Sequence, residues 1–310
     1  MASEPILTAF DQAVAKRSRL SESNIWFDYF ALTKPEVNFL IVITTFAGFY
    51  LGCHSEWHDF PFLRSMNALL GTLLVASGTG ALNQYIERRF DAQMRRTARR
   101  PLAAGRLKSS AVLWFGIALS VLGSIYLAAA ACLLASLLAL GTLLSYLFLY
   151  TPLKRKSPLC TLVGALPGAM PPLIGWTAAS RHLSFGAWIL YAILFLWQFP
   201  HFMSIAWMYR EDYARAGYLV LPREERLRGR LVNWQTLLPL LLLAPVSLFP
   251  AVPGKPSVSY CIAATLLCCG FLYFGTQFVL RKSNSSARQL LTASVIYLPS
   301  LFVLMVVLRG

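Results

Sequence analysis

Eight long stretches of this 310-residue chain contain no charged residue. They run over residues 37–53, 66–85, 111–150, 158–179, 183–209, 231–252, 258–280 and 290–308. An apolar helix of about 20 residues crosses the hydrocarbon core of a membrane, which is about 30 Å thick. The stretch over 111–150 has 40 residues, enough for two such helices, and we expect a tight turn between them near residues 128–132. The sequence therefore predicts nine transmembrane segments.

The composition supports a membrane protein. Hydrophobic residues make up 57% of the chain and charged residues only 13%, whereas soluble domains have about 45–50% and about 25%. Backbone polar groups in lipid must be paired within the protein, so the segments are expected to be helices; a membrane β-barrel would instead show short alternating strands. We predict an all-α, polytopic protein, with residues 1–35 as a cytoplasmic N-terminal arm and residues 36–310 as a single nine-helix domain.

The basic residues are distributed very unevenly along this pattern. The chain has 28 Lys and Arg residues and a net charge of +15, a balance that in a soluble protein would suggest a nucleic-acid partner. With nine segments, however, 24 of these basic residues lie on the same side of the membrane as the N-terminus. The other four are Arg64, Arg181, Lys255 and Arg309. Because basic loops stay in the cytoplasm, we expect a cytoplasmic N-terminus, an external C-terminus and no nucleic-acid partner.

The residues before the first segment argue against a targeting peptide. They include Glu4, Asp11, Glu22 and Asp28, and no apolar run precedes residue 37. A signal peptide needs such a run, and transit peptides are poor in acids. We therefore expect the bacterial inner (plasma) membrane, with an organelle inner membrane as an alternative. The six cysteines show no C-x-x-C spacing, so the sequence supports neither a zinc site nor a disulfide framework.

A row of polar side chains ends the second segment. Asn83, Glu87 and Asp91 recur every four residues and share one face if the helix continues. Their oxygen atoms are ligands of the type that Mg²⁺ prefers, and Mg²⁺ usually shares its remaining positions with water and phosphate. Five arginines follow within residues 95–106. One guanidinium group can donate two parallel hydrogen bonds to the oxygens of a phosphate. The pattern favours a diphosphate site; the alternative is a solvated helix end with arginines that only set the topology.

A second acidic group ends the sixth segment in the same way. Glu211 and Asp212 lie between Tyr209 and Tyr213 and are followed by a basic loop. Each group follows an even-numbered segment, which suggests a duplicated helix–loop–helix unit. Two facing carboxylate groups could hold two cations around one polyanion, in a mouth open to the cytoplasm.

At this point the chain resembles the UbiA-type intramembrane prenyltransferases and, within them, the branch that prenylates heme. The resemblance extends over nearly the whole chain from Leu32 onward. It rests on six motifs in the same order: Thr33-Lys34-Pro35, the 83–91 row with Arg96-Thr97 and Arg100-Pro101, Tyr150 to Arg155, Gly164 to Trp176, Trp197 to Phe202, and Tyr209 to Gly217. Three positions depart from the family pattern, namely Glu87 and Arg89 where many members have Asp, and Val220 where Met is usual. The departures leave the metal geometry of the first row less defined.

The resemblance implies a Mg²⁺-dependent transfer of a farnesyl group from farnesyl diphosphate to a vinyl group of heme b, with addition of water. The implied Mg²⁺ ligands are Asn83, Glu87, Asp91, Glu211 and Asp212. The implied catalytic set comprises Asn83, Glu87, Asp91, Arg96, Tyr209 and Asp212. The implied substrate-binding residues are Lys34, Arg100, Lys154, Arg155, Trp197, Gln198, His201, Phe202 and Tyr213. A heme A synthase or an oxidase-assembly protein is an implied partner, and the lipid bilayer surrounds the domain.

Several alternatives stay open. Within the same superfamily, the acceptor could be a quinone or chlorin ring. In a different class, a transporter of an anionic metabolite could line its path with the same charges, although transporters place such groups near the midplane. His201 could be a packed, hydrogen-bonded residue and not a heme contact.

Overall fold

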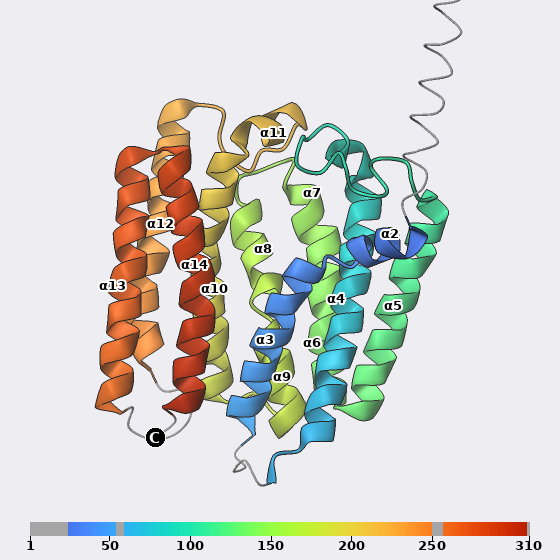
Figure 1. Ribbon diagram of the computed structural model, residues 1–310, viewed down its shortest axis with the longest axis vertical. Coiled ribbons are helices and arrows are strands. Elements are labelled where there is room, and N and C mark those ends of the chain that lie inside the picture. Colours follow the sequence, from blue (N-terminus) through green and yellow to red (C-terminus); the bar gives the residue numbers. More distant parts are fainter. Residues whose placement is uncertain (1–23, 54–58, 250–256, 309–310) are drawn as a thin grey trace, which may run out of the picture.

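The structure, a computed structural model, describes residues 24–53, 59–249 and 257–308. In these ranges every regular element is a helix, and nine helices are long and apolar enough to cross a membrane. They form one upright bundle (Figure 1). The predicted all-α class and the nine segments are thus confirmed, and the orientation of the termini stays a prediction. Glu4, Asp11, Glu22, Lys255 and Arg309 lie outside the described residues.

The nine spans follow the order of the apolar stretches. They are α3 (Pro35–Gly52); α4 (Phe62–Asp91); α5 (Ser109–Ala130); α6 (Leu133–Leu144) with a π-helical turn (Ser145–Tyr150) and α7 (Thr151–Leu153); α8 (Cys160–Gly168) with α9 (Pro171–Ser180); α10 (Phe185–Met208); α12 (Glu225–Leu248); α13 (Val258–Arg281); and α14 (Asn284–Val307). Two short helices, α2 (Ile25–Leu32) and α11 (Arg210–Arg215), complete the described elements. The turn expected near residues 128–132 is confirmed, because α5 ends at Ala130 and α6 begins at Leu133.

The bundle has two packed halves. Helix α4 packs along α5, and α3 packs against α9. In the second half α10 packs against α12 and α14, and α13 packs against the same two helices. Helix α10 also contacts α8, α9 and α3, which joins the halves. The basic loops that follow α4, α7 and α10 lie at the same end of the bundle (Figure 1).

Prolines interrupt two spans. Pro152 lacks an N–H for the carbonyl four residues earlier, and the preceding turn, Ser145–Tyr150, is a wider π-helix. The fifth span breaks between α8, which ends at Gly168, and α9, which begins at Pro171. Both interruptions break the regular α-helical hydrogen bonding within a span.

Helix α2 lies across the upright helices (Figure 1). Its Trp26 and Phe27 are exposed, at 78% and 70%, as expected for a helix whose apolar face meets lipid. On its other side Asp28 is buried and accepts hydrogen bonds of 2.9–3.0 Å from Arg106, in the loop after α4. The described part of the predicted N-terminal arm is therefore attached to the bundle.

Close helix contacts depend on glycine. A Cβ atom added at Gly175 in α9 would lie 1.9 Å from the carbonyl oxygen of Thr45 in α3. Small residues allow such backbone approach between helices in lipid, where packing replaces the hydrophobic effect as the source of association.

We predict that Gly175→Ala destabilises the bundle by about 1–3 kcal/mol, because the added methyl group forces α3 and α9 apart. The matched control is Gly141→Ala in α6, where nothing lies within 4 Å of the added Cβ atom. The measurement is the thermal unfolding of both purified variants in detergent. Equal melting temperatures for the two variants would contradict the close contact.

Candidate active site

The acidic row lies on one face of α4. The helix continues through Asp91, so Asn83, Glu87 and Asp91 form a line over its last turns. All three are buried, with exposures of 1%, 6% and 1%. Ionisable groups so placed in a membrane protein need partners and are mostly functional.

Each member of the row has a basic partner from a different part of the chain. Lys34 Nζ donates to Asn83 Oδ1 over 2.7 Å. Lys154 Nζ donates to Glu87 Oε1 over 2.9 Å. Arg100 Nη1 donates to Asp91 Oδ2 over 2.8 Å. Three basic side chains thus face two carboxylates and one neutral amide. Arg100 and Lys154 balance the two carboxylates, so Lys34 is the basic group left to meet a polyanion.

Lys34 reaches the row because of an unusual backbone conformation. It precedes α3 with φ 55° and ψ 63°, the left-handed region that non-glycine residues rarely adopt. Asn38 stabilises this corner by donating to the Thr33 carbonyl over 2.8 Å and to Ser77 Oγ over 2.9 Å. Burial lowers the pKa of Lys34 to about 7, and the nearby Arg100 acts in the same direction.

Lys154 is positioned by the irregular end of the fourth span. It follows α7 directly, and its ammonium group lies 4.4 Å from the centre of the Tyr150 ring, a favourable cation–π distance. Burial opposes its charge, but the Glu87 carboxylate raises the pKa of Lys154 well above its ordinary value. Its backbone carbonyl accepts a hydrogen bond of 2.7 Å from Leu219 N–H, which attaches the loop after α11.

Asp212, of the second acidic group, contacts the loop that follows α4. Asp212 is buried, and its Oδ2 accepts from the backbone N–H of Arg96 over 3.4 Å. Arg215 donates to Asp212 Oδ1 over 3.2 Å. The Arg96 guanidinium lies 3.5 Å from the Tyr213 hydroxyl and 5.1 Å from the centre of the Tyr209 ring. The two loops are therefore one assembly, with Met94, Ala216 and Tyr218 as its small apolar core.

Two predicted residues stand at the margin of this assembly. The Glu211 side chain is 82% exposed and lies 3.9 Å from Arg210, so the structure does not bring it to the acidic row. Arg155 is exposed, and its guanidinium covers the Phe90 ring at 4.4 Å.

The donor set fits a magnesium ion shared with a phosphate group. Asp91 Oδ1 is buried and has no hydrogen-bond partner, so one carboxylate oxygen is left for a cation. Among the described residues no three acidic, histidine or cysteine side chains cluster closely enough to hold a metal alone. An ion here would need substrate oxygens or water as further ligands, as is usual for Mg²⁺.

The predicted heme contacts lie deeper, in α10. His201 Nδ1 is 2.8 Å from Ser294 Oγ, and Trp197 Nε1 donates to the Ser294 carbonyl over 2.7 Å. The two rings stack with their centres 4.6 Å apart, and Phe202 is edge-on to His201 at 5.8 Å. Gln198 is buried and donates to two backbone carbonyls. The structure does not place these four residues beside the acidic row.

Comparison with known proteins identifies the family. The sequence pattern of the UbiA prenyltransferase family matches residues 41–302, which is most of the chain. The chain belongs to the UbiA prenyltransferase family.

Relatives in this family carry a more specific name. Protoheme IX farnesyltransferase from Solibacter usitatus is 47% identical over 288 residues, which cover 91% of this chain and 98% of the relative. The enzymes of that name from Koribacter versatilis and Salinibacter ruber are 43% and 42% identical, each over 91% of this chain and over 93% and 98% of their own lengths.

Solved structures show the same UbiA fold. A digeranylgeranylglyceryl phosphate synthase superposes with a TM-score of 0.74 at 16% identity, covering 91% of this chain and 98% of that one. A UbiA homologue from Archaeoglobus fulgidus, bound to GPP and Mg²⁺, gives a TM-score of 0.61 at 15% identity and covers 90% and 99%. At this level of identity the likeness concerns the fold alone.

Sequence reasoning missed two residues of this UbiA site. Thr151 Oγ1 accepts from Asn83 Nδ2 over 3.3 Å, and Tyr218 lies beside Glu87. Burial and the carboxylates of Glu87 and Asp91 raise the pKa of Tyr218. Thr151 follows Tyr150 in a motif already noted, and Tyr218 follows Gly217, whose φ of 73° makes the turn. Both residues thus lie in or next to one of the sequence motifs. Spacing along the chain could not show that Thr151 contacts Asn83 or that Tyr218 lies beside Glu87.

We predict that Lys154→Met destabilises the protein by about 3–5 kcal/mol, because it leaves the buried Glu87 carboxylate without its partner. Lys156→Met, two residues away at an exposed position, is the matched control. Thermal unfolding in detergent measures both, and the double variant Glu87→Gln/Lys154→Met should regain much of the loss. A single variant as stable as the control would refute the pairing.

Proposed function

We propose that this chain transfers the farnesyl group of farnesyl diphosphate to a vinyl group of protoheme IX (heme b), with addition of water, and so produces heme O. The observation that carries the proposal is the buried row of Asn83, Glu87 and Asp91, with its excess of basic partners at the end of a transmembrane helix. The name shared by relatives with up to 47% identity supports the choice of substrates.

The basic side chains bind and orient the diphosphate. Lys34, Arg100 and Lys154 already converge on α4, and exposed Arg96 and Arg155 extend the positive surface toward the loops. Guanidinium groups donate two parallel hydrogen bonds to phosphate oxygens, and lysine adds a point charge. These contacts fix the leaving group at the end of the bundle and leave the farnesyl chain among apolar helix faces.

Magnesium is the proposed cofactor. Asn83, Glu87, Asp91 and Asp212 would hold it, and the bound ion would neutralise the charge that develops on the departing diphosphate. The exposed position of Glu211 removes that residue from the proposed ligand set.

The reaction breaks the allylic C–O bond, and its electron pair stays on the diphosphate oxygen. The π electrons of the heme vinyl group then form the new C–C bond, and water captures the resulting cation and releases a proton. Tyr150, Tyr209 and Tyr213 present aromatic rings near the basic side chains. Such faces stabilise a cation and exclude water from it.

His201 is the proposed heme contact. Its Nδ1 is engaged with Ser294, so Nε2 is the ring nitrogen available to the heme iron. Stacking on Trp197 fixes the plane of the ring, and Gln198 and Phe202 flank it. We place the protein in the bacterial inner membrane, where a heme A synthase or an oxidase-assembly protein is the proposed recipient of the product.

The activity is testable with purified protein, heme b, farnesyl diphosphate and Mg²⁺. We expect a product whose mass equals that of heme b plus a farnesyl group and a hydroxyl group, and no product when Mg²⁺ is chelated. Prenylation of a quinone precursor or a chlorin, with heme b left unchanged, would overturn the proposed acceptor. Uptake of an anionic metabolite into vesicles without any prenylated product would favour a transporter.

The ligand assignment predicts that Asp91→Asn and Asp212→Asn each lower activity by about 100-fold or more, since each removes a charged metal ligand. Both variants should also need more Mg²⁺ for half-maximal rate. Glu225→Gln, at an exposed acid at the start of α12, is the matched control. Full activity and an unchanged Mg²⁺ dependence in either aspartate variant would show that the assignment is wrong.

A further inference from the structure

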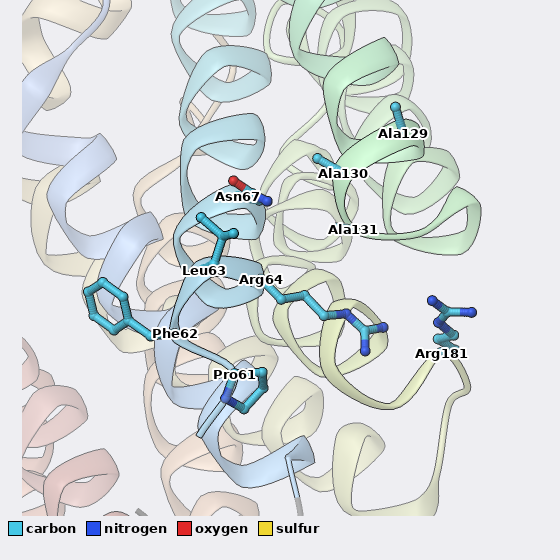
Figure 2. A pocket seen from close by; sticks show the side chains of 9 residues that line it. All are labelled: Pro61, Phe62, Leu63, Arg64, Asn67, Ala129, Ala130, Ala131 and Arg181. Atoms are coloured by element: carbon cyan, nitrogen blue, oxygen red, sulfur yellow. The ribbon is translucent and has the colours of Figure 1, made fainter. Parts of the chain in front are cut away.

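A pocket with a volume of about 470 Å³ lies at the opposite end of α4 from the acidic row. Helix α4 has 30 residues, so its ends are about 45 Å apart. The start of α4, the end of α5 and the residue that follows α9 form the walls of the pocket (Figure 2). It is therefore separate from the diphosphate site.

Two arginines from distant parts of the sequence line this pocket. Arg64 comes from the first turn of α4, and Arg181 follows α9. Figure 2 shows the Arg64 side chain extending toward Arg181. Both belong to the four basic residues that the charge pattern assigns to the external side of the membrane.

Neither guanidinium group has a partner within the part of the chain that the structure describes. No hydrogen bond or ion pair joins either side chain to another described residue. The Arg64 Nη2 atom is also buried without a hydrogen bond. A buried donor without a partner is costly, and the cost is larger for a charged group. This cost concerns Arg64, because Arg181 is exposed.

The other polar side chain in the pocket, that of Asn67, can also donate. Asn67 Oδ1 already accepts from the Tyr126 hydroxyl over 2.8 Å, so the amide of Asn67 offers its N–H groups. Among the described residues, no acidic side chain lines the pocket. Two cations and an amide donor form a site for an oxyanion, because the polar side chains that line the pocket all donate.

The rim of the pocket is apolar. Phe62 and Leu63 line it and are 65% and 75% exposed at the start of a helix that is long and apolar enough to cross a membrane. A ligand with an anionic head and an apolar tail fits both parts. A free inorganic ion would use only the arginines.

We propose that Arg64, Arg181 and Asn67 bind the phosphate of an anionic phospholipid head group, with its acyl chains along Phe62 and Leu63. The lipid completes the hydrogen bonds of Arg64 Nη2 and links the start of α4 to the end of α9. Its site is fixed in the protein, in contrast to the general attraction of basic loops for anionic lipid.

The test titrates the full-length protein in neutral detergent with phosphatidylglycerol and counts bound lipid by native mass spectrometry. We expect one tight lipid in the wild type and at least about tenfold weaker binding of it in Arg64→Gln/Arg181→Gln, which loses two charge-assisted contacts. The matched control is Arg281→Gln/Arg288→Gln, which removes the same charge at exposed positions elsewhere and should keep the tight lipid.

A parallel arm distinguishes the source of the phosphate. Phosphatidylcholine should bind more weakly than phosphatidylglycerol, and millimolar inorganic phosphate should not displace the tight lipid. Equal affinity for phosphatidylglycerol in Arg64→Gln/Arg181→Gln and in its control would overturn the proposal. Binding of inorganic phosphate in place of the lipid would also overturn it. A thermal unfolding curve of Arg64→Gln/Arg181→Gln without lipid, matching that of the control, ensures that a loss of binding is not a loss of fold.

Discussion

The rest of the site depends on one requirement, that carboxylates buried in a transmembrane bundle be paired. Glu87 and Asp91 lie on α4 where water is scarce, and an isolated charge there would be strongly unfavourable. Their partners, Lys154 and Arg100, come from separate loops. The need to pair these acids therefore determines where the loops at this end of the bundle lie.

This pairing also links the two halves of the molecule. The carbonyl of Lys154 accepts from Leu219, and the backbone of Arg96 donates to Asp212. Both contacts join a loop of the first half to the loop around α11. The acids that follow the second and sixth spans therefore belong to one hydrogen-bonded assembly, in which the backbone N–H of Arg96 donates to Asp212.

The sequence predicted the features that depend on hydropathy and spacing. Charge-free stretches marked the nine spans, and the interval of four residues placed Asn83, Glu87 and Asp91 on one helix face. These features are local, so a single segment contains all the information. The turn between α5 and α6 was predictable from length alone, although no polar residue marks it.

Other features depend on contacts between distant segments, which spacing does not contain. Nothing local assigns Lys154 to Glu87 or Ser294 to His201, and nothing distinguishes buried Asp212 from exposed Glu211 beside it. The uncommon π-helical turn before Pro152 could not be distinguished from an ordinary kink. Arg64 was assigned a side of the membrane, but its unpaired state appears only in three dimensions.

The left-handed backbone at Lys34 has a consequence for ligand binding. A lysine side chain normally loses rotational freedom when it is fixed on a ligand, and this loss weakens the complex. Here the strained corner, held by Asn38 and followed by Pro35, aims Lys34 at α4 before any ligand arrives. The folded protein has already met the entropic cost of ordering this amino group, so an anion meets a preorganised hydrogen-bond donor.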